Sequence, residues 1–253
     1  MLKKLFLAII LVILSAIAGA GIWFGLWVLS LPNISDLKKA DTGLSINVKD
    51  ANGKHRDWIV GVRNPSWIPL SRVSPHIIDA VVAAEDDAFF QHDGFDFEEL
   101  KNSIKADLKK KRFARGASTI TMQVARNLYL TKEKTISRKL KETYLTYRLE
   151  NTLTKNRILE LYLNIAEWGP GIYGIGQASG YYFGKGPSEL NLNEAALLAV
   201  ILPNPRYFNP YTRMAKVEKR QNYLLMRMFT EHYIATEEYE AAVSTSVELR
   251  EKL

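Results

Sequence analysis

The sequence predicts a mainly α-helical domain that carries a small β-hairpin and is preceded by one transmembrane helix. Three observations favour this class. A long apolar run near the N-terminus holds no charge, one short segment alternates around an Asn-Gly pair, and beyond Pro69 most segments show apolar residues at helical spacing. With 253 residues, 47% of them hydrophobic, the chain can bury a proper core.

The apolar run covers residues 5–31, which contain no charged side chain over 27 positions. As a helix it would be roughly 40 Å long, which exceeds the roughly 30 Å hydrocarbon core of a bilayer. Its flanks hold cytoplasmic-type lysines and interfacial-type aromatics, namely Lys3, Lys4, Trp23 and Trp27. We therefore expect residues 1–31 to form a cytoplasmic N-terminus and a membrane anchor. A cleaved signal peptide ending near Ala18-Gly19-Ala20 is the alternative.

The net charge of +7 indicates an anionic partner. For a domain held outside a membrane, lipid head groups and phosphorylated lipids are at hand, and nucleic acid is not expected. The basic run KKKRFAR at 109–115 also fits a solvated loop. Because the chain has no cysteine and its four histidines show no ligand spacing, no metal site is predicted from these residue types.

Residues 32–70 are expected to form a linker and a small β element. The stretch GLSINVKDANGKHRDWIVG at 43–61 alternates on both sides of Asn52-Gly53, the pair that favours a tight hairpin turn. This segment therefore predicts two antiparallel strands.

Residues 71–253 are expected to form one mostly helical domain. Its first helix opens with Ser74 as N-cap and Pro75 at the first helical position, and Gly94 sits where it must end. Further helices are expected at 97–111, 118–129, 135–153, 155–167, 192–202 and 213–231.

The stretch AEDDAFFQHDGFD at 84–96 places three successive acids near the end of the first helix, where the macrodipole is already negative. Helical spacing puts Glu85 on the apolar face, with Ile78, Val81, Val82 and Phe89. Desolvation and the neighbouring acids Asp86 and Asp87 would raise the pKa of Glu85 toward the range of a general base. A buried acid paired with an arginine, or a frayed helix end, would explain the pattern equally well.

A second acid, Glu142, lies in the predicted helix 135–153 and shares a row with Arg138, Leu145 and Leu149. Another row makes this helix apolar on two sides and hence central: Ile136, Leu140, Tyr144 and Tyr147. A cationic stripe adjoins Glu142 and consists of Lys134, Lys141, Arg148 and Lys155. Such a stripe is usually a solvated face, but cations beside acids are also what an anionic leaving group needs.

The stretch ARGASTITMQVARNLYL at 114–130 lies between the two acids and is hydroxylated at its start. Ser118, Thr119 and Thr121 are candidate helix caps. An exposed helix N-terminus with these hydroxyls and the nearby Arg115 would hold phosphate. Capping alone accounts for the same residues.

Five segments with the character of motifs follow one another between residues 80 and 210. They are EDDAFFQHDGFD (85–96), RGASTITMQVARN (115–127), RKLKETYLTYRLE with KNRILELYLN (138–164), GIYGIGQASGYYFGK (171–185) and LNLNEAALLAVILPNPRYFNP (190–210). In this order they resemble the five motifs of the peptidoglycan glycosyltransferases, most closely the monofunctional, membrane-anchored type. The same glycosyltransferase domain occurs in class A penicillin-binding proteins.

This resemblance implies a lysozyme-like, mainly helical fold with a large lobe, a membrane-proximal jaw and an active cleft between them. It implies polymerisation of lipid II, with inversion, into β-1,4-linked glycan strands, release of undecaprenyl diphosphate and no transpeptidase activity. The implied partners are lipid II, the growing glycan chain, membrane lipids and other cell-wall synthesis proteins. The implied place is the outer, periplasmic face of the bacterial plasma membrane. The sequence does not reveal whether a metal is needed, and the resemblance implies Mg²⁺ or Mn²⁺ at the diphosphate as an aid, since such ions often help this family.

The resemblance also implies residue roles. Glu85 matches the general base that takes a proton from the 4-hydroxyl of the acceptor sugar, and Glu142 matches the second essential acid, on the donor side. Positions that line the cleft or contact diphosphate are matched by Phe89, Ser118, Thr119, Gln123, Lys134, Arg138, Lys139 and Lys141. Arg126 stands where the family often has Lys, and Arg148 belongs to the cationic stripe; both are expected to bind substrate. Met122 replaces a frequent Gln, which predicts an altered substrate grip.

Two other functions compete with this hypothesis. A lysozyme-like enzyme that cleaves glycan would also use carboxylates, but it needs a protonated acid for a sugar leaving group, whereas the cationic stripe favours a diphosphate. A catalytically silent scaffold that binds lipid II is the second alternative, and the presence of both glutamates disfavours it.

Overall fold

The computed structural model describes the chain except for residues 1, 111–117, 132, 134 and 252–253. It divides into two compact units, residues 1–33 and residues 34–253. The first unit contains helix α1 (Leu2–Leu29). None of the helices in the described part of the chain has the length and apolar character that crossing a membrane requires. The predicted anchor is therefore not confirmed.

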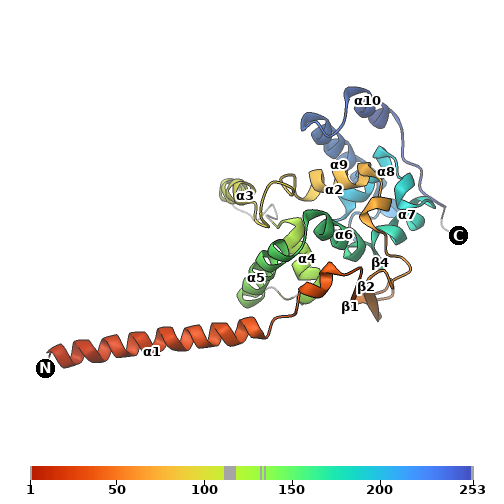
Figure 1. The fold of residues 1–253 in the computed structure, drawn as a ribbon. Coiled ribbons are helices and arrows are strands. Elements are labelled where there is room, and N and C mark those ends of the chain that lie inside the picture. Colours follow the sequence, from red (N-terminus) through yellow and green to blue (C-terminus); the bar gives the residue numbers. More distant parts are fainter. Residues whose placement is uncertain (1, 111–117, 132, 134, 252–253) are drawn as a thin grey trace. The chain divides into compact units, whose positions relative to one another are not determined.

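The second unit is mainly helical, as the sequence predicts (Figure 1). Its helices are α2 (Pro75–Glu85), α3 (Phe97–Lys110), α4 (Ile120–Tyr129), α5 (Ile136–Thr152), α6 (Lys155–Ile165), α7 (Ile175–Phe183), α8 (Leu192–Ile201), α9 (Pro210–Thr230) and α10 (Thr236–Ser244). Short 3₁₀ turns occur at η1 (Ser35–Lys38), η2 (Leu70–Arg72) and η3 (Pro187–Glu189). Its strands are β1 (Asp41–Lys49), β2 (His55–Gly61), β3 (Glu167–Gly169) and β4 (Ile172–Tyr173).

The predicted hairpin is confirmed. Strands β1 and β2 pair antiparallel, with Asn47 opposite Asp57, and Gly53 in the turn has a φ of 82°, which glycine adopts without strain. The indole of Trp58 is buried and donates a hydrogen bond to the Asn164 carbonyl of α6, 3.1 Å away. This bond and the burial of the ring fix the hairpin on the helical part of the unit.

The core is built around α8 and α4. Every residue of α8 is buried, including the polar Asn193 and Glu194, and α8 packs against α2 and α9. Helix α4 packs against both α5 and α6. It therefore lies between the helix that carries Glu142 and the helix that carries the buried Tyr162.

Most predicted helices occur close to their expected bounds, because their starts carry readable caps. Thr119, Thr135 and Thr154 each cap a helix by accepting a hydrogen bond from the backbone N–H three residues later. Helices α7 and α10 and the β3–β4 hairpin were not predicted. Helix α9 begins at Pro210, three residues before its expected start at 213.

Two predictions about particular helices are wrong. Helix α2 ends at Glu85 and does not extend toward Gly94, so Phe89 lies beyond the helix that carries Glu85. Helix α5 is not apolar toward the core on two sides, because Ile136, Leu140 and Tyr147 are exposed. Apolar spacing alone does not distinguish a face that meets the core from one that meets another surface.

Candidate active site

Glu85 is the last residue of α2, and few interactions offset the burial of its carboxylate. Its Oε2 accepts a hydrogen bond of 2.7 Å from the side-chain amide of Gln123, on α4. Its Oε1 is buried and has no hydrogen-bond partner, a property shared only with the hydroxyl of Tyr129 among the buried side-chain atoms that the structure describes. One oxygen of Glu85 thus keeps an unused capacity to accept a hydrogen bond.

The environment of Glu85 raises its pKa above the ordinary value of a glutamate. Burial is the main cause, because it disfavours the charged form. The hydrogen bond from Gln123 and the charges of Arg126 and Arg220 oppose this rise, and the negative charge of Asp86 adds to it. The result is a carboxylate that takes up a proton more readily than an exposed one.

Glu142 is buried as a whole residue, whereas Glu85 is half-buried with a buried carboxyl group, and Glu142 is held by cations. It is 1% exposed and accepts hydrogen bonds from Arg138, one turn before it on α5, and from Lys139. Arg138 is largely shielded, at 17% exposure, whereas Lys139 is 47% exposed. A buried carboxylate with two cationic partners suits a place where cations must be kept in position.

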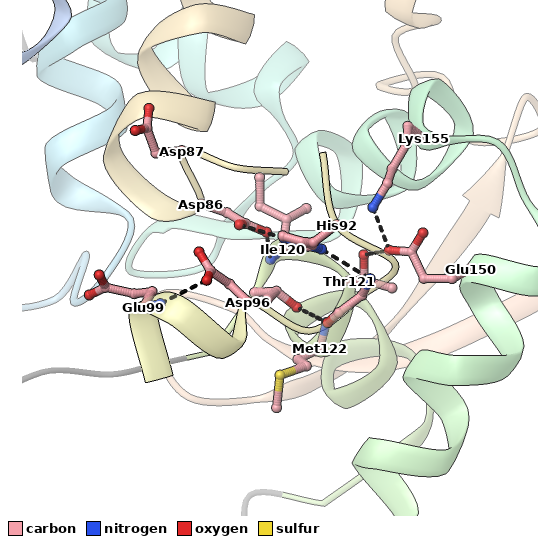
Figure 2. A network of polar contacts seen from close by, with 12 residues as sticks. Asp86, Asp87, His92, Asp96, Glu99, Ile120, Thr121, Met122, Glu150 and Lys155 are labelled. Atoms are coloured by element: carbon pink, nitrogen blue, oxygen red, sulfur yellow. Dashed lines mark hydrogen bonds and ion pairs between the residues drawn. The ribbon is translucent and has the colours of Figure 1, made fainter. Parts of the chain in front are cut away.

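The acids that follow α2 have a structural explanation. Asp86 lies outside the helix, and its carboxylate accepts a bond of 2.9 Å from the backbone N–H of Ile120 at the start of α4 (Figure 2). It also accepts a bond of 2.8 Å from His92, whose other ring nitrogen accepts from the N–H of Gly94. The positive end of α4 therefore stabilises Asp86, and the expected cost of an acid at the end of α2 does not arise.

The loop after Glu85 packs directly on the helix that carries Glu142. Gly94 has a φ of 90°, and a Cβ there would meet side-chain atoms of Glu150 at 2.8 Å and Thr146 at 2.9 Å. Thr146 and Glu150 follow Glu142 at intervals of four residues, so the three share one face of α5. Glycine is required because the loop approaches this face so closely.

Glu150 ties this face to the two neighbouring helices. It accepts hydrogen bonds from Thr121 of α4 and from Lys155 at the start of α6, the latter at 2.8 Å (Figure 2). The ammonium of Lys155 also lies 4.6 Å from the ring centre of the fully buried Phe89. The elements that carry Glu85 and Glu142 are thus joined through α4, the loop and Glu150.

The structure brings several predicted substrate residues to these acids. Gln123 and Arg126 lie beside Glu85, and Arg138 and Lys139 bind Glu142. Thr119 is buried and serves as the N-cap of α4, which is the alternative that the sequence left open.

The remaining predicted residues are less closely connected to the acids. Ser118, Lys141 and Arg148 are partly exposed, and Phe89 is fully buried instead of open to a ligand. The predicted cationic stripe is wrong at one position, since Lys155 belongs to α6 and pairs with Glu150. Lys134 and Arg115 lie outside the described residues.

Sequence reasoning missed two residues near Glu85, namely Arg220 and Tyr162. Arg220 comes from α9, far along the chain, and no local pattern connects it with Glu85. Tyr162 is buried and donates to Gln123, but its helical spacing resembles that of any core aromatic residue. Asp86 raises the pKa of Glu85, as the sequence predicts, but its hydrogen bond with the start of α4 was not predicted.

A metal site finds no support in the geometry. Among the described residues, no group of three or more His, Asp or Glu side chains converges so that it could hold a metal ion. The expectation that a divalent cation helps at the diphosphate is not tested by the side chains alone, because substrate oxygens would supply ligands as well.

Fold and site together define a class of protein: a mainly helical enzyme domain with one poorly compensated carboxylate and one carboxylate held by cations. The family model described as Transglycosylase matches residues 52–229. Among curated relatives, a biosynthetic peptidoglycan transglycosylase of Chromobacterium violaceum is 37% identical over 218 residues, which are 85% of this chain and 94% of that protein. The protein of the same description from Nitrosomonas eutropha is 43% identical over 164 residues, covering 65% of this chain and 67% of that protein.

The chain belongs to the transglycosylase family. It also aligns with penicillin-binding protein 1A of Aquifex aeolicus at 35% identity over 251 residues, which are 99% of this chain but 34% of that protein. The chain thus spans about a third of that larger relative and nearly all of the transglycosylase from Chromobacterium. Its family and relatives assign it to glycan polymerisation in cell-wall synthesis.

Proposed function

We propose that this chain polymerises lipid II into β-1,4-linked glycan with inversion, and that Glu85 is the general base. The observation that carries the proposal is the buried, unpartnered Oε1 of Glu85 in a setting that raises its pKa. The 4-hydroxyl of the acceptor sugar attacks the anomeric carbon of the donor and gives its proton to this oxygen. The bond from the anomeric carbon to the diphosphate oxygen breaks, and undecaprenyl diphosphate leaves with the bonding electrons.

Glu142 has a different role in this proposal. The leaving group departs as an anion, so it needs positive charge more than a proton. Arg138 and Lys139 bind Glu142, and this contact holds both cations on one end of α5. We assign Arg138, Lys139, Lys141 and Arg148 to the diphosphate side, with Glu142 as the residue that positions the first two.

We further propose that the reaction takes place at the outer face of the bacterial plasma membrane, in a lysozyme-like fold and without transpeptidase chemistry. The sequence supports a membrane anchor at residues 5–31, since they carry no charge. The exposed apolar residues Ile136, Leu140 and Tyr147 on α5 support contact with an apolar surface. Deletion of residues 2–31 would release the protein from membranes on fractionation if residues 5–31 are its anchor; unchanged retention would reject that role.

Incubation of the purified full-length chain with lipid II, and separately with finished glycan, tests the function. We expect lipid II to be converted to polymer, with release of undecaprenyl diphosphate, and finished glycan to keep its length. Shortening of glycan without synthesis would support the cleaving enzyme, and binding of lipid II without turnover would support the scaffold. Either result rejects polymerisation.

The base assignment has a matched control. Glu85→Gln should lower polymerisation by about 10²–10⁴-fold, the usual contribution of a general base. Asp87→Asn makes the same acid-to-amide change two residues away, where the side chain contacts Tyr233 and Arg227 instead of Gln123. Asp87→Asn should keep most of the activity, and equal losses in both variants would reject Glu85 as base.

A further inference from the structure

A buried tyrosine lies behind the base, on the far side of Gln123. Tyr162 comes from α6 and is 1% exposed. Its hydroxyl donates a hydrogen bond of 3.4 Å to the Oε1 of Gln123, and the Nε2 of the same amide donates at 2.7 Å to Glu85. Tyr162, Gln123 and Glu85 therefore form one line of donors and acceptors from the core to the base.

We infer that Tyr162 is a positioning residue that fixes the direction of the Gln123 amide, so that the amide nitrogen faces Glu85 throughout the reaction. This inference rests on the proposed role of Glu85 as the base. A glutamine amide has a donating end and an accepting end, and the two differ little in shape. The hydrogen bonds formed by the oxygen and the nitrogen therefore decide which way the amide points.

The need for such a device arises when Glu85 has taken up the proton. While Glu85 is a carboxylate it only accepts, so the amide nitrogen must face it. After proton transfer, a carboxylic acid also has a donor, and an amide turned by 180° would accept that proton through its oxygen. The turned amide would stabilise the protonated acid, and Glu85 would then be slow to give up its proton and act as a base again.

Tyr162 opposes this turn because its hydroxyl donates only to Gln123 among the groups that the structure describes. If the amide turned, its oxygen would leave, and a buried O–H would lose that acceptor. Burial raises the pKa of Tyr162 well above its ordinary value, with the negative charge of Glu85 as the next cause, so the hydroxyl remains a donor. The fixed amide therefore favours return of the proton and recovery of the base.

Charged groups around Glu85 also change its pKa, independently of the direction of the Gln123 amide. Arg126 of α4 and Arg220 of α9 lower the pKa of Glu85, and the adjacent Asp86 raises it. None of them forms a hydrogen bond with Gln123 in the described part of the chain. Removing the Tyr162 hydroxyl changes the amide's freedom and leaves these charges in place.

Tyr162→Phe is the direct test, made in the full-length chain with the pH profile of kcat/KM for lipid II polymerisation. We expect the acidic limb of the profile to move up by about 0.5–1 pH unit, because the freed amide stabilises protonated Glu85. The rate well above that limb should change little. In a chain that carries Gln123→Ala, Tyr162→Phe should move the limb no further, since the amide through which it acts is gone.

Tyr182→Phe is the matched control. It removes another buried tyrosine hydroxyl, which donates to the backbone carbonyl of Trp168 and, among the described residues, makes no hydrogen bond with Gln123. The control should leave the acidic limb in place. An unmoved limb in Tyr162→Phe, or the same shift with and without Gln123→Ala, overturns the inference.

A second readout needs no substrate. The difference in unfolding temperature between chains with and without Glu85→Gln, followed against pH, reports the pKa of Glu85 itself. Tyr162→Phe should shift this titration upward as well. If the shift appears here while the unmodified chain makes no polymer, the proposed function fails and the positioning role stands; if polymerisation occurs and neither titration moves, the positioning role alone fails.

Discussion

Glu85 and Glu142 are both buried carboxylates, but the protein compensates for their burial in opposite ways. Glu142 receives two hydrogen bonds from cations. Glu85 receives one bond from a neutral amide and leaves Oε1 without a partner. This difference fits the roles proposed for them, in which Glu85 accepts a proton and Glu142 holds cations in position. In that proposal the same side chain serves two purposes because its neighbours differ.

The largest expected effect is an opposite change in stability from the same substitution at the two positions. Glu142→Gln leaves Arg138 and Lys139 without their anionic partner and should lower the free energy of unfolding at neutral pH by about 1.5–3 kcal/mol. Glu85→Gln removes a charge that burial penalises and should raise the unfolding temperature. Both variants should lose polymerisation. Thermal unfolding at pH 7 measures both changes. A shift of the unfolding temperature in the same direction in both variants would contradict the prediction.

The sequence predicts some features of the two glutamates and not others. The helices were predictable because Thr119, Thr135 and Pro75 mark their starts chemically. Both glutamates stood out as acids that share a helix face with apolar residues. Their partners were not equally predictable from the sequence. Arg138 is one turn from Glu142 on the same helix, whereas the Gln123 that binds Glu85 comes from another helix.

Tyr162 and Arg220 show where sequence reasoning ends. Their approach to Glu85 depends on how α6 and α9 pack, which no local spacing encodes. The exposed row on α5 was misassigned for the same reason, since Ile136 and Leu140 have the spacing of core residues but face outward. Local chemistry predicts elements, and tertiary packing decides which side chains meet.

The pH dependence sharpens the contrast further. Because the pKa of Glu85 is raised, the base becomes protonated at a pH above the ordinary glutamate range, and kcat/KM should fall about tenfold per pH unit below that point. Titration of Glu85 also changes the free energy of unfolding, but its contribution decreases as the pH rises, whereas kcat/KM increases. The folded state binds the proton more tightly, so this contribution is present below the unfolded pKa and is lost as pH rises through the folded pKa.

Glu85→Gln isolates that contribution. At low pH both chains carry a neutral side chain at position 85 and should have similar unfolding temperatures. Above the folded pKa of Glu85 the substituted chain should be the more stable one. A stability difference that does not depend on pH would show that Glu85 does not titrate in the folded protein above its ordinary range.

The two cations that bind Glu142 should differ in importance. Arg138 is 17% exposed and Lys139 is 47% exposed, so water screens the lysine bond more strongly. Arg138→Ala should lower the free energy of unfolding by about 1.5–3 kcal/mol, and Lys139→Ala by less than about 1 kcal/mol. Chemical denaturation of both variants measures the difference, and equal losses would show that Glu142 is not held mainly by the arginine.

The smallest expected effect concerns Lys141, which has no ion pair with the described residues, in contrast to Lys155, which is bound by Glu150. If Lys141 serves the diphosphate of the substrate, Lys141→Ala should raise KM for lipid II several-fold and change stability by less than about 0.5 kcal/mol. Lys155→Ala should mainly lower stability, because it leaves Glu150 with one partner fewer in a buried setting. Unchanged turnover of Lys141→Ala at low lipid II concentration would remove Lys141 from the diphosphate side and confine the cationic role to the pair that Glu142 holds.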